Sequence, residues 1–279
     1  MELKKHPKQL YALGDISLLN KDSVAVVGSR NCDNYGREET ERFAGFLAKK
    51  GICIVSGLAV GIDTVAHTTS MNEEGKTIAV VASGFEHIYP KQNEKLFHKI
   101  IENGGCIISE YPPETEVDMG KFPKRNIIIS AISIATLIVE ATLRCGSTIT
   151  GRETMKQNKP LFCVPGDIDA ILSGGTNQLI LEGAYLVTTP YDILDTLEFE
   201  GYNYENAITV KENCQEVFKA ITAAPKTIDE LIEETGLDIV DINEILLILE
   251  MDDWIKNEDG KYEVKPNYLR DRRKRKSAT

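Results

Sequence analysis

The stretch Val24-Ala25-Val26-Val27-Gly28-Ser29-Arg30 decides the fold of this chain. Four apolar residues, three of them β-branched, form a run too short for a helix that stops at a glycine, which is typical of a strand buried on both faces. A helix is predicted next, from about Asn34 to Lys50. The backbone N–H groups at the start of a helix favour an anion, and Arg30 adds a full positive charge. The stretch therefore predicts a phosphate-binding turn whose candidate ligands are Gly28, Ser29 and Arg30.

The unit of a strand followed by a helix repeats from residue 23 to residue 193. This alternation predicts an α/β fold, a Rossmann-like parallel sheet with helices on both faces. Ligands of such sheets bind outside the carboxyl ends of the strands, where the glycine-rich loops of this chain gather. The further predicted strands are Ile52–Val55, Ile78–Val81, Cys106–Ser109, Ile134–Val139, Pro160–Val164 and Tyr185–Val187, and the further predicted helices span about 62–71, 93–102, 125–133, 148–157 and 178–182.

Four other segments flank or follow this domain. Residues 1–22 are a short lead-in that we expect to pack on an edge of the main domain, and residues 194–211 are a predicted linker. Residues 212–264 contain three helical patterns and a predicted hairpin turned at Asp259-Gly260, which together are typical of a winged helix. Residues 265–279 form a basic tail.

The net charge of −11 is distributed unevenly along the chain. The winged-helix segment, residues 212–264, holds 15 acidic and 4 basic residues, while the tail holds 7 basic residues and 1 acidic residue. A winged helix that reads DNA needs basic residues on its third helix, whereas Asp238, Asp241 and Glu244 begin this one. We therefore expect this module to have a protein-contact or packing role instead of reading DNA. Two roles stay open for the tail: nonspecific attraction to DNA, or packing on the acidic module.

The composition also excludes several classes of protein. The six cysteines are scattered without a C-x-x-C pair, so a metal site is not expected and reduced cytoplasm is the simplest setting. No apolar stretch approaches the ~20 residues that span a bilayer, and the first residues lack the apolar core of a secretory signal. We therefore expect no contact with a membrane.

A dinucleotide cofactor is not expected at the first turn. The NAD fingerprint needs G-x-G-x-x-G after the first strand and an acidic residue at the end of the second. Here the turn reads Gly28-Ser29-Arg30-Asn31, and the second strand ends in Ser56-Gly57. Moreover, the Arg30 side chain occupies the place where a pyrophosphate needs close approach to the backbone.

Several short motifs in register resemble the DNA-processing A family, also called DprA or Smf. The resemblance covers about residues 10–190 and implies a Rossmann-like domain that binds single-stranded DNA without strong sequence preference, dimerises and helps load the RecA recombinase during natural transformation. It implies no catalysis and no cofactor. Some members begin with a SAM-type helical domain, which we expect to be absent here. The motifs are Val27-Gly28-Ser29-Arg30 with Tyr35-Gly36, Ser56–Asp63 with Ala66-His67, Tyr89-Pro90 with Asn93, Ser109–Pro113, Phe122–Asn126, Glu140-Ala141 with Gly146-Ser147-Thr148, and Pro165-Gly166 with Asn177.

Arg30 is the first candidate for contact with DNA, because its planar cation can make two hydrogen bonds to a phosphate. A salt bridge from Arg30 to Asp33 or Glu38 is the structural alternative. Gly57 and Gly61 are candidates for close approach of a DNA backbone. Asp63 is expected to cap the helix that it opens, since a carboxylate repels phosphate.

A second candidate region, residues 121–126, supplies Lys121, Phe122, Lys124, Arg125 and Asn126. Cations that follow a DNA backbone, interleaved with a ring that stacks on a base, suit single strands. The alternative for Phe122 is a role as a buried plug of the core.

Gly146, Ser147 and Thr148 are candidate anion ligands at a helix start. The turn from Glu140 to Thr148 is also similar to that of Rossmann-like nucleotide hydrolases of the nucleoside monophosphate phosphoribohydrolase type, although it lacks their paired glycines. Hydrolysis of a nucleotide is thus the alternative function. We expect Glu140 to anchor loop N–H groups or pair with Arg30 or Arg125, and His67 to be structural.

Overall fold

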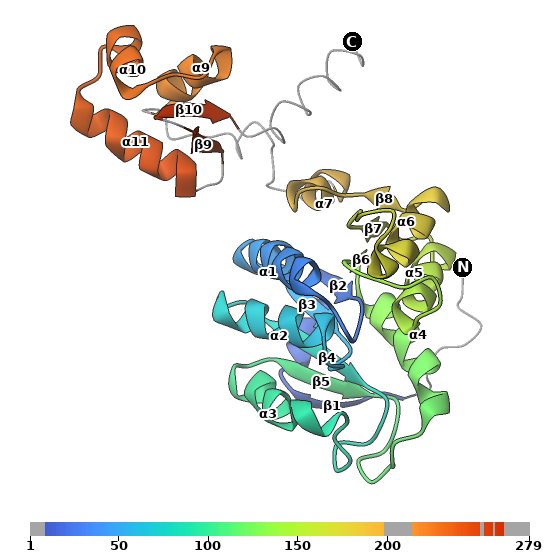
Figure 1. Cartoon of the computed structure of the whole chain (residues 1–279). Helices are drawn as coiled ribbons and strands as arrows, with labels where there is room; N and C mark the ends of the chain where they lie inside the picture. The colour runs from blue at the N-terminus through green and yellow to red at the C-terminus, as the bar shows by residue number, and fades with distance from the viewer. Residues whose placement is uncertain (1–8, 198–213, 252–253, 259, 265–279) are drawn as a thin grey trace. The chain divides into compact units, whose positions relative to one another are not determined.

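The computed structural model describes residues 9–197, 214–251, 254–258 and 260–264. It divides into two compact units, residues 1–197 and residues 198–279 (Figure 1). Residues 198–211 of the predicted linker and the whole basic tail lie outside the described residues. Residues 194–196, which were expected in the linker, belong instead to the helix α7.

The larger unit contains the predicted sheet. Its eight described strands lie in the order β1-β5-β4-β3-β2-β6-β7-β8, and all pairs except β1 with β5 are parallel. β-branched and other apolar residues fill the central strands, which are buried on both faces. The strands are β1 Tyr11–Gly14, β2 Ser23–Val27, β3 Cys53–Ser56, β4 Thr77–Val81, β5 Cys106–Ser109, β6 Ala135–Ile138, β7 Leu161–Cys163 and β8 Tyr185–Leu186.

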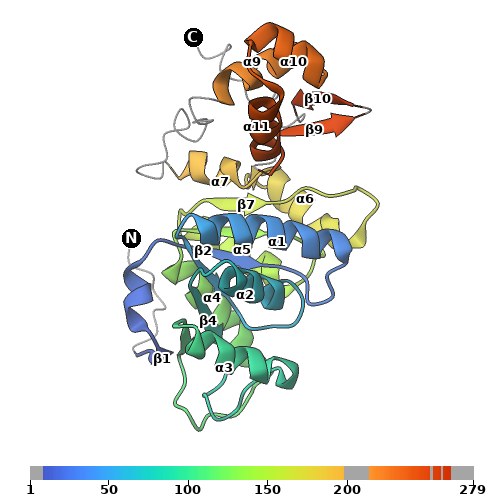
Figure 2. The same ribbon diagram turned by 90° about the vertical axis from the view of Figure 1, so that its left-hand side faces the viewer.

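Helices cover both faces of this sheet. Figures 1 and 2 show α1, α2 and α3 on one face and α4, α5 and α6 on the other. Most of the predicted helices are confirmed with small changes of bounds, but α4 begins three residues before the expected start at Arg125. The α-helices are α1 Asn34–Lys49, α2 Ile62–Asn72, α3 Glu94–Glu102, α4 Phe122–Ile132, α5 Gly146–Lys156, α6 Gly174–Leu181 and α7 Tyr191–Thr196, and the 3-10 helices are η1 Ile16–Asn20, η2 Lys91–Asn93, η3 Met119–Lys121 and η4 Ile171–Ser173.

The lead-in adds a strand that the sequence did not predict. β1 pairs antiparallel with β5, with Tyr11 opposite Ser109 and Gly14 opposite Cys106. The sheet is therefore mostly parallel instead of wholly parallel. Residues 11–14 carry no alternation of buried and exposed side chains, because they only cover the free backbone edge of β5. This pairing is tertiary, so a local pattern does not reveal it.

The strand order creates a switch point beside β2. From β2 the chain proceeds through β3 and β4 to β5, and then returns to place β6 on the other side of β2. The loops that follow β2 and β6 consequently diverge to opposite faces of the sheet. A crevice at the carboxyl ends of these two strands is the expected ligand site of such a fold.

The smaller unit is a winged helix, as predicted. It consists of α9 Gln215–Ala223, α10 Ile228–Thr235, α11 Ile239–Met251, β9 Ile255–Glu258 and β10 Lys261–Val264. The three helices and the hairpin enclose their own apolar core. Thr227 begins α10 with a reciprocal capping box to Glu230.

Among the described helices of both units, none has the length and apolar character that crossing a bilayer requires.

Candidate nucleic-acid interface

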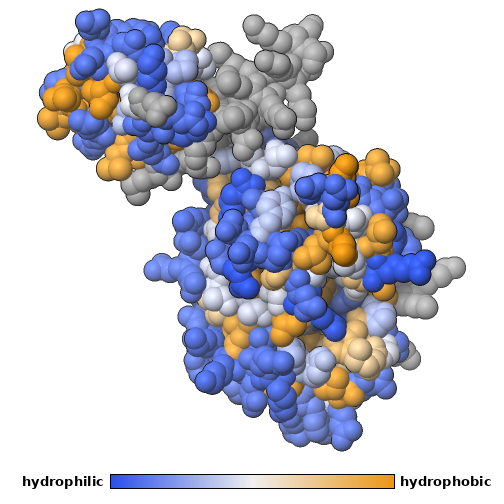
Figure 3. All heavy atoms as spheres, viewed as in Figure 1, coloured by the Kyte–Doolittle hydropathy of each residue, from blue (hydrophilic) through white to orange (hydrophobic). Residues whose placement is uncertain are grey.

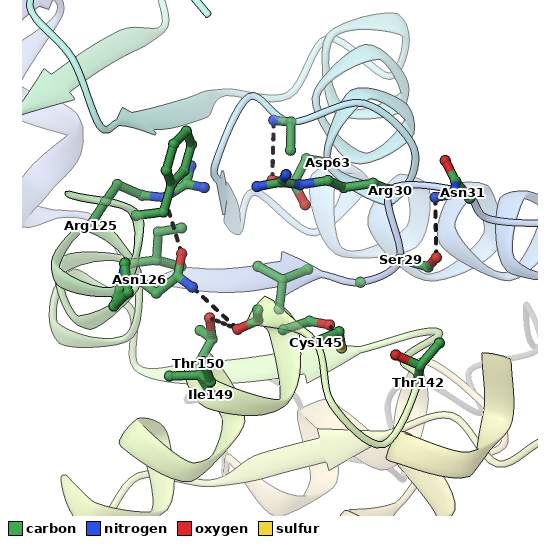
Figure 4. Close-up of a pocket in the computed structure, with 18 residues that line it drawn as sticks. Ser29, Arg30, Asn31, Asp63, Arg125, Asn126, Thr142, Cys145, Ile149 and Thr150 are labelled. Atoms are coloured by element: carbon green, nitrogen blue, oxygen red, sulfur yellow. Dashed lines mark hydrogen bonds between the residues drawn. The ribbon is translucent and has the colours of Figure 1, made fainter. Parts of the chain in front are cut away.

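A hollow of about 380 Å³ opens at the switch point, between the loops after β2 and β6 (Figure 4). Its wall on the β2 side is the turn from Gly28 to Asn31. The opposite walls are the first turn of α4 and the start of α5, which begins at Gly146. The turn after β2, the region 121–126 and the turn at 146–148 therefore meet around one hollow, although they are far apart in the sequence.

The turn after β2 holds Arg30 at the surface. The Ser29 hydroxyl accepts a hydrogen bond from the Asn31 N–H at 3.1 Å, and the Ser29 carbonyl accepts one from the Ile62 N–H at 3.1 Å. The exposed Arg30 guanidinium lies over the Phe122 ring, 5.4 Å from its centroid. Asp33 caps α1 by accepting from the Gly36 N–H, and the described ion pairs join Arg30 to no carboxylate. Arg30 thus keeps hydrogen-bond donors for a ligand.

Arg125 points into the protein. Its side chain is only 5% exposed, and one terminal nitrogen donates to the carbonyls of Gly57 and Val80, the latter at 2.8 Å. Its Nε donates to Asn126 Oδ1 at 3.1 Å, and Asn126 Nδ2 donates to the Gly146 carbonyl at 3.2 Å. This chain of bonds ties the ends of β3 and β4 to the starts of α4 and α5. Burial lowers the pKa of Arg125 to about 10.

Asp63 holds the turn after β3 and does not cap α2. The Asp63 carboxylate accepts from the N–H groups of Gly57 at 3.0 Å and Ala59 at 3.3 Å, which both precede the helix. The helix cap is Gly61, without a side-chain hydrogen bond. Burial raises the pKa of Asp63, while the nearby charge of Arg125 acts in the opposite direction. Asp63 and Arg125 are thus two buried groups of opposite charge that attract each other, and both line the hollow.

The two glycines of this turn serve the protein's own packing. A Cβ on Gly57 would collide with the Arg125 guanidinium, and a Cβ on Gly61 would meet the carbonyl oxygens of Ser29 and Arg30. Gly61 also has a φ of +79°, a conformation that side chains disfavour. Packing inside the protein therefore requires glycine at both positions, and close approach of DNA there stays a prediction.

The start of α5 presents a free helix end to the hollow. Its N-cap residue, Cys145, makes no capping hydrogen bond; its Sγ lies 2.9 Å from the Ser147 hydroxyl. The Thr148 hydroxyl donates back to the Cys145 carbonyl at 2.8 Å. No side chain of the described residues therefore caps the first N–H groups of α5, which suit an anion. Sequence reasoning did not single out Cys145, whose position follows only from where the helix begins.

Phe122 separates this hollow from a smaller one of about 40 Å³. The half-buried Phe122 ring packs edge-on against Tyr89 at 5.8 Å, and Tyr89 lines the smaller hollow together with Pro90 and Val60. Arg30 and Phe122 line both hollows. Phe122 is therefore neither a buried plug nor a free platform, and it contacts the exposed arginine directly.

The two lysines of the region 121–126 differ in their surroundings. Lys121 donates to the Glu116 carbonyl at 2.7 Å and lies 4.9 Å from the centre of the Tyr111 ring. Lys124 is exposed on the first turn of α4. Lys124 is consequently the more available cation beside the hollow.

Glu140 and His67 are buried and support the structure. A Glu140 carboxylate oxygen accepts from the Asp33 N–H at 3.3 Å, which confirms the expected anchoring of loop N–H groups. Burial, followed by the neighbouring Asp33, raises the pKa of Glu140 to about 7. His67 Nδ1 lies 2.7 Å from the Thr77 hydroxyl, and burial lowers the pKa of His67 to about 3.

The fold and the hollow together define a class of protein, a Rossmann-like domain with a crevice at its switch point that is followed in the chain by a winged helix. A family profile described as DNA recombination-mediator protein A matches residues 1–198, and one described as DprA winged helix domain matches residues 207–261. The chain belongs to the DNA recombination-mediator protein A family, and the resemblance seen in the sequence is confirmed.

Relatives from bacteria support this membership. Protein Smf of Escherichia coli is 35% identical over 268 residues, which are 92% of this chain and 71% of that protein. A crystal structure of DprA from Streptococcus pneumoniae has 40% identity and a TM-score of 0.63, covering 67% of this chain and 65% of that one. A DprA structure from Helicobacter pylori, described as showing that protein's single-stranded DNA binding mode, has 35% identity and a TM-score of 0.65, covering 71% of this chain and 90% of that one.

Proposed function

We propose that this chain is a cytoplasmic protein that binds single-stranded DNA without sequence preference and mediates loading of a RecA recombinase in natural transformation and recombination. One observation carries the DNA-binding proposal: the exposed, unpaired Arg30 faces the same hollow as the uncapped start of α5. The role with RecA rests on membership of the family. The described single-strand binding of the Helicobacter pylori relative supports the choice of ligand.

The groups around the hollow match the parts of a single strand. Arg30, Lys124 and the N–H groups of Gly146 to Thr148 suit successive phosphates, since cations and helix starts attract anions. Ser29 is a further hydrogen-bond partner on the same wall. Contacts to phosphates carry no sequence information, so this arrangement tolerates any sequence. Lys121, whose Nζ is held by the Glu116 carbonyl, would add charge more than direct contact.

Arg125 and Asn126 have an indirect role in this proposal. Because Arg125 donates to the Val80 carbonyl and to Asn126 Oδ1, and Asn126 donates to the Gly146 carbonyl, the two side chains position the walls around the DNA. Gly28, Gly57 and Gly61 act in the same way, since each leaves room for a neighbouring group of the protein.

We propose no catalysis at this site. A nucleotide hydrolase needs a carboxylate that is free to act on its substrate. Asp63, the carboxylate that lines the hollow, is held by two backbone N–H groups, and Glu140 anchors the start of α1. Because both carboxylates accept hydrogen bonds from the protein backbone, the site favours binding of DNA over hydrolysis of a nucleotide.

We further propose that the protein is a homodimer through the sheet edge at β8. Large apolar side chains are exposed there, and Figure 3 shows apolar surface over the region of α6 and β8. A patch of this kind beside an open strand favours a second copy of the same edge. The exposed side chains are Leu143 (58%), Ile168 (89%), Ile171 (81%), Leu181 (83%), Tyr185 (53%) and Leu186 (51%).

A parallel assay separates the two candidate functions. An oligonucleotide of mixed sequence is titrated by fluorescence anisotropy, while the same preparation is incubated with nucleoside monophosphates and followed for release of free base. We expect binding at about micromolar or lower concentration that weakens as salt rises, without turnover. Turnover without oligonucleotide binding would instead identify the nucleotide hydrolase.

A further inference from the structure

The third helix of the winged-helix unit presents an unusual surface. Val240, Glu244 and Leu247 recur at helical spacing on the face of α11 that points away from the core. Val240 is 69% exposed and Leu247 is 57% exposed. Figure 3 shows apolar side chains at the surface of the smaller unit beside polar ones. We call the residues Val240, Glu244 and Leu247 the outer face of α11.

The charge around the outer face is negative and has few cations to balance it. Glu244, Asp241 and Glu250 are exposed on α11, and Asp238 precedes the helix. Two of the unit's lysines are already in ion pairs elsewhere, Lys226 with Glu234 and Lys256 with Glu258 and Glu263. A partner of this face must therefore be basic and also carry apolar side chains.

The chain itself contains a segment with this chemistry. Residues 265–279 hold seven basic residues and one acidic residue, and the apolar pair Tyr268-Leu269 precedes the basic run from Arg270 to Lys276. The acidic winged-helix segment and this tail have opposite net charges, −11 and +6. We propose that the outer face of α11 docks the chain's own tail, residues 265–279.

The geometry of the hairpin supports this occupant. Val264, the last described residue before the tail, pairs with Ile255, and Ile255 follows the end of α11 at Met251 by four positions. The tail therefore starts near the carboxyl end of α11. A helix of 13 residues is about 20 Å long, whereas 15 extended residues span up to about 50 Å.

The order of residues in the tail also fits. Tyr268 and Leu269 come within reach of Leu247 first, and the run from Arg270 to Lys276 then reaches the acidic residues toward the start of α11. Because the tail is covalently joined to β10, its effective concentration at α11 is about millimolar, so even a weak contact would be mostly formed. The inference goes beyond the proposed DNA binding and does not depend on it.

Limited proteolysis of the full-length chain tests this proposal. Trypsin cuts after Arg and Lys, and the release of tail fragments is followed by mass spectrometry in the wild type and in two variants, Glu244→Lys and Leu247→Ser. We expect both variants to lose the tail about tenfold faster than the wild type. Circular dichroism melts verify that the exposed substitutions leave the unit folded.

Glu233→Lys is the matched control, because Glu233 is an exposed acid on α10 and its substitution changes the net charge by the same amount. Equal tail cleavage in the wild type, Glu244→Lys and Leu247→Ser would overturn the proposal. Equal acceleration by Glu233→Lys and Glu244→Lys would also overturn it, since only diffuse attraction would remain. Protection that rises with protein concentration would show docking on a second copy and would contradict docking within one chain.

Discussion

Two arginines from different regions line the same hollow and have opposite surroundings. Arg30, from the turn after β2, is exposed and lies over the Phe122 ring, whereas Arg125, from α4, is buried against carbonyl oxygens. Figure 4 shows the two side chains approaching from opposite walls. Arg30 has donors left for a ligand, whereas Arg125 uses its Nε and one terminal nitrogen to bind the protein itself. Two equal charges in one hollow thus differ: we propose that Arg30 binds DNA, whereas Arg125 holds the protein's own loops together.

The burial of Arg125 depends on which way α4 is turned about its axis. Because this helix begins at Phe122, with Pro123 in its first turn where no N–H is needed, Lys124 faces solvent and Arg125 faces inward. Asp63 and the carbonyls of Gly57 and Val80 then receive the inward cation.

Replacement of Arg125 should have the largest effect in this comparison. Arg125→Met leaves buried carbonyls unpaired and Asp63 without its neutralising charge, so we expect a loss of about 3 to 5 kcal/mol in the free energy of unfolding. Chemical denaturation measures this loss. The same substitution one residue earlier, Lys124→Met, should cost within about 0.5 kcal/mol because that side chain is exposed. Equal costs would contradict the assigned difference between the positions.

Replacement of Phe122 tests whether the ring beneath the Arg30 guanidinium contributes to DNA binding. Phe122→Leu keeps apolar bulk but removes the ring under the guanidinium, a contact of about 0.5 to 1 kcal/mol at exposed sites. We expect oligonucleotide affinity to fall about two- to fivefold with little change in the unfolding midpoint. A loss of stability without a loss of affinity would instead identify Phe122 as a structural plug.

Lys124 should contribute a smaller, purely ionic effect. If it contacts one phosphate, Lys124→Ala lowers affinity a few-fold and reduces the slope of log affinity against log salt by about 0.7. Anisotropy titrations at several salt concentrations measure this slope. Lys95→Ala, an exposed lysine on α3, is the control and should leave the slope unchanged. Identical slopes for wild type and Lys124→Ala would remove Lys124 from the interface.

Glu140 holds the loop that follows Arg30 by accepting from the Asp33 N–H. It should give the smallest effect, which is a dependence of the free energy of unfolding on pH. Its folded pKa is raised to about 7, so between its ordinary value of 4.5 and 7 the folded state keeps a proton that the unfolded chain has released. Stability should therefore fall as pH rises through this window and then level off. Denaturation of Glu140→Gln should lack this slope, whereas the exposed Glu38→Gln should keep it. A slope retained in Glu140→Gln would assign it to another group.

Much of the fold was predictable from the sequence because its causes are local. Short β-branched runs that stop at glycine identified the parallel strands, and the helix patterns between them identified the layers. The edge strand Tyr11–Gly14 was missed, since its only cause is pairing with β5.

The sequence predicted where the site lies, but it did not predict which side chains contact one another there. The sheet's carboxyl edge brought together the turns that contain Arg30, Phe122 and Gly146, as expected. Two features were not predictable: the burial of Arg125, and the hydrogen bonds by which Asp63 holds the turn after β3. Both depend on which way the side chains of separate elements point.

The central claim is that Arg30 binds DNA and does not hold the fold, and one measurement tests it most directly. Oligonucleotide affinity of Arg30→Ala is compared with that of the wild type at low salt, with thermal melts on the same samples. Loss of a charged hydrogen bond to phosphate should weaken binding about tenfold or more while the melting temperature stays unchanged. Unchanged affinity, or weaker binding only in proportion to lost stability, would contradict the claim.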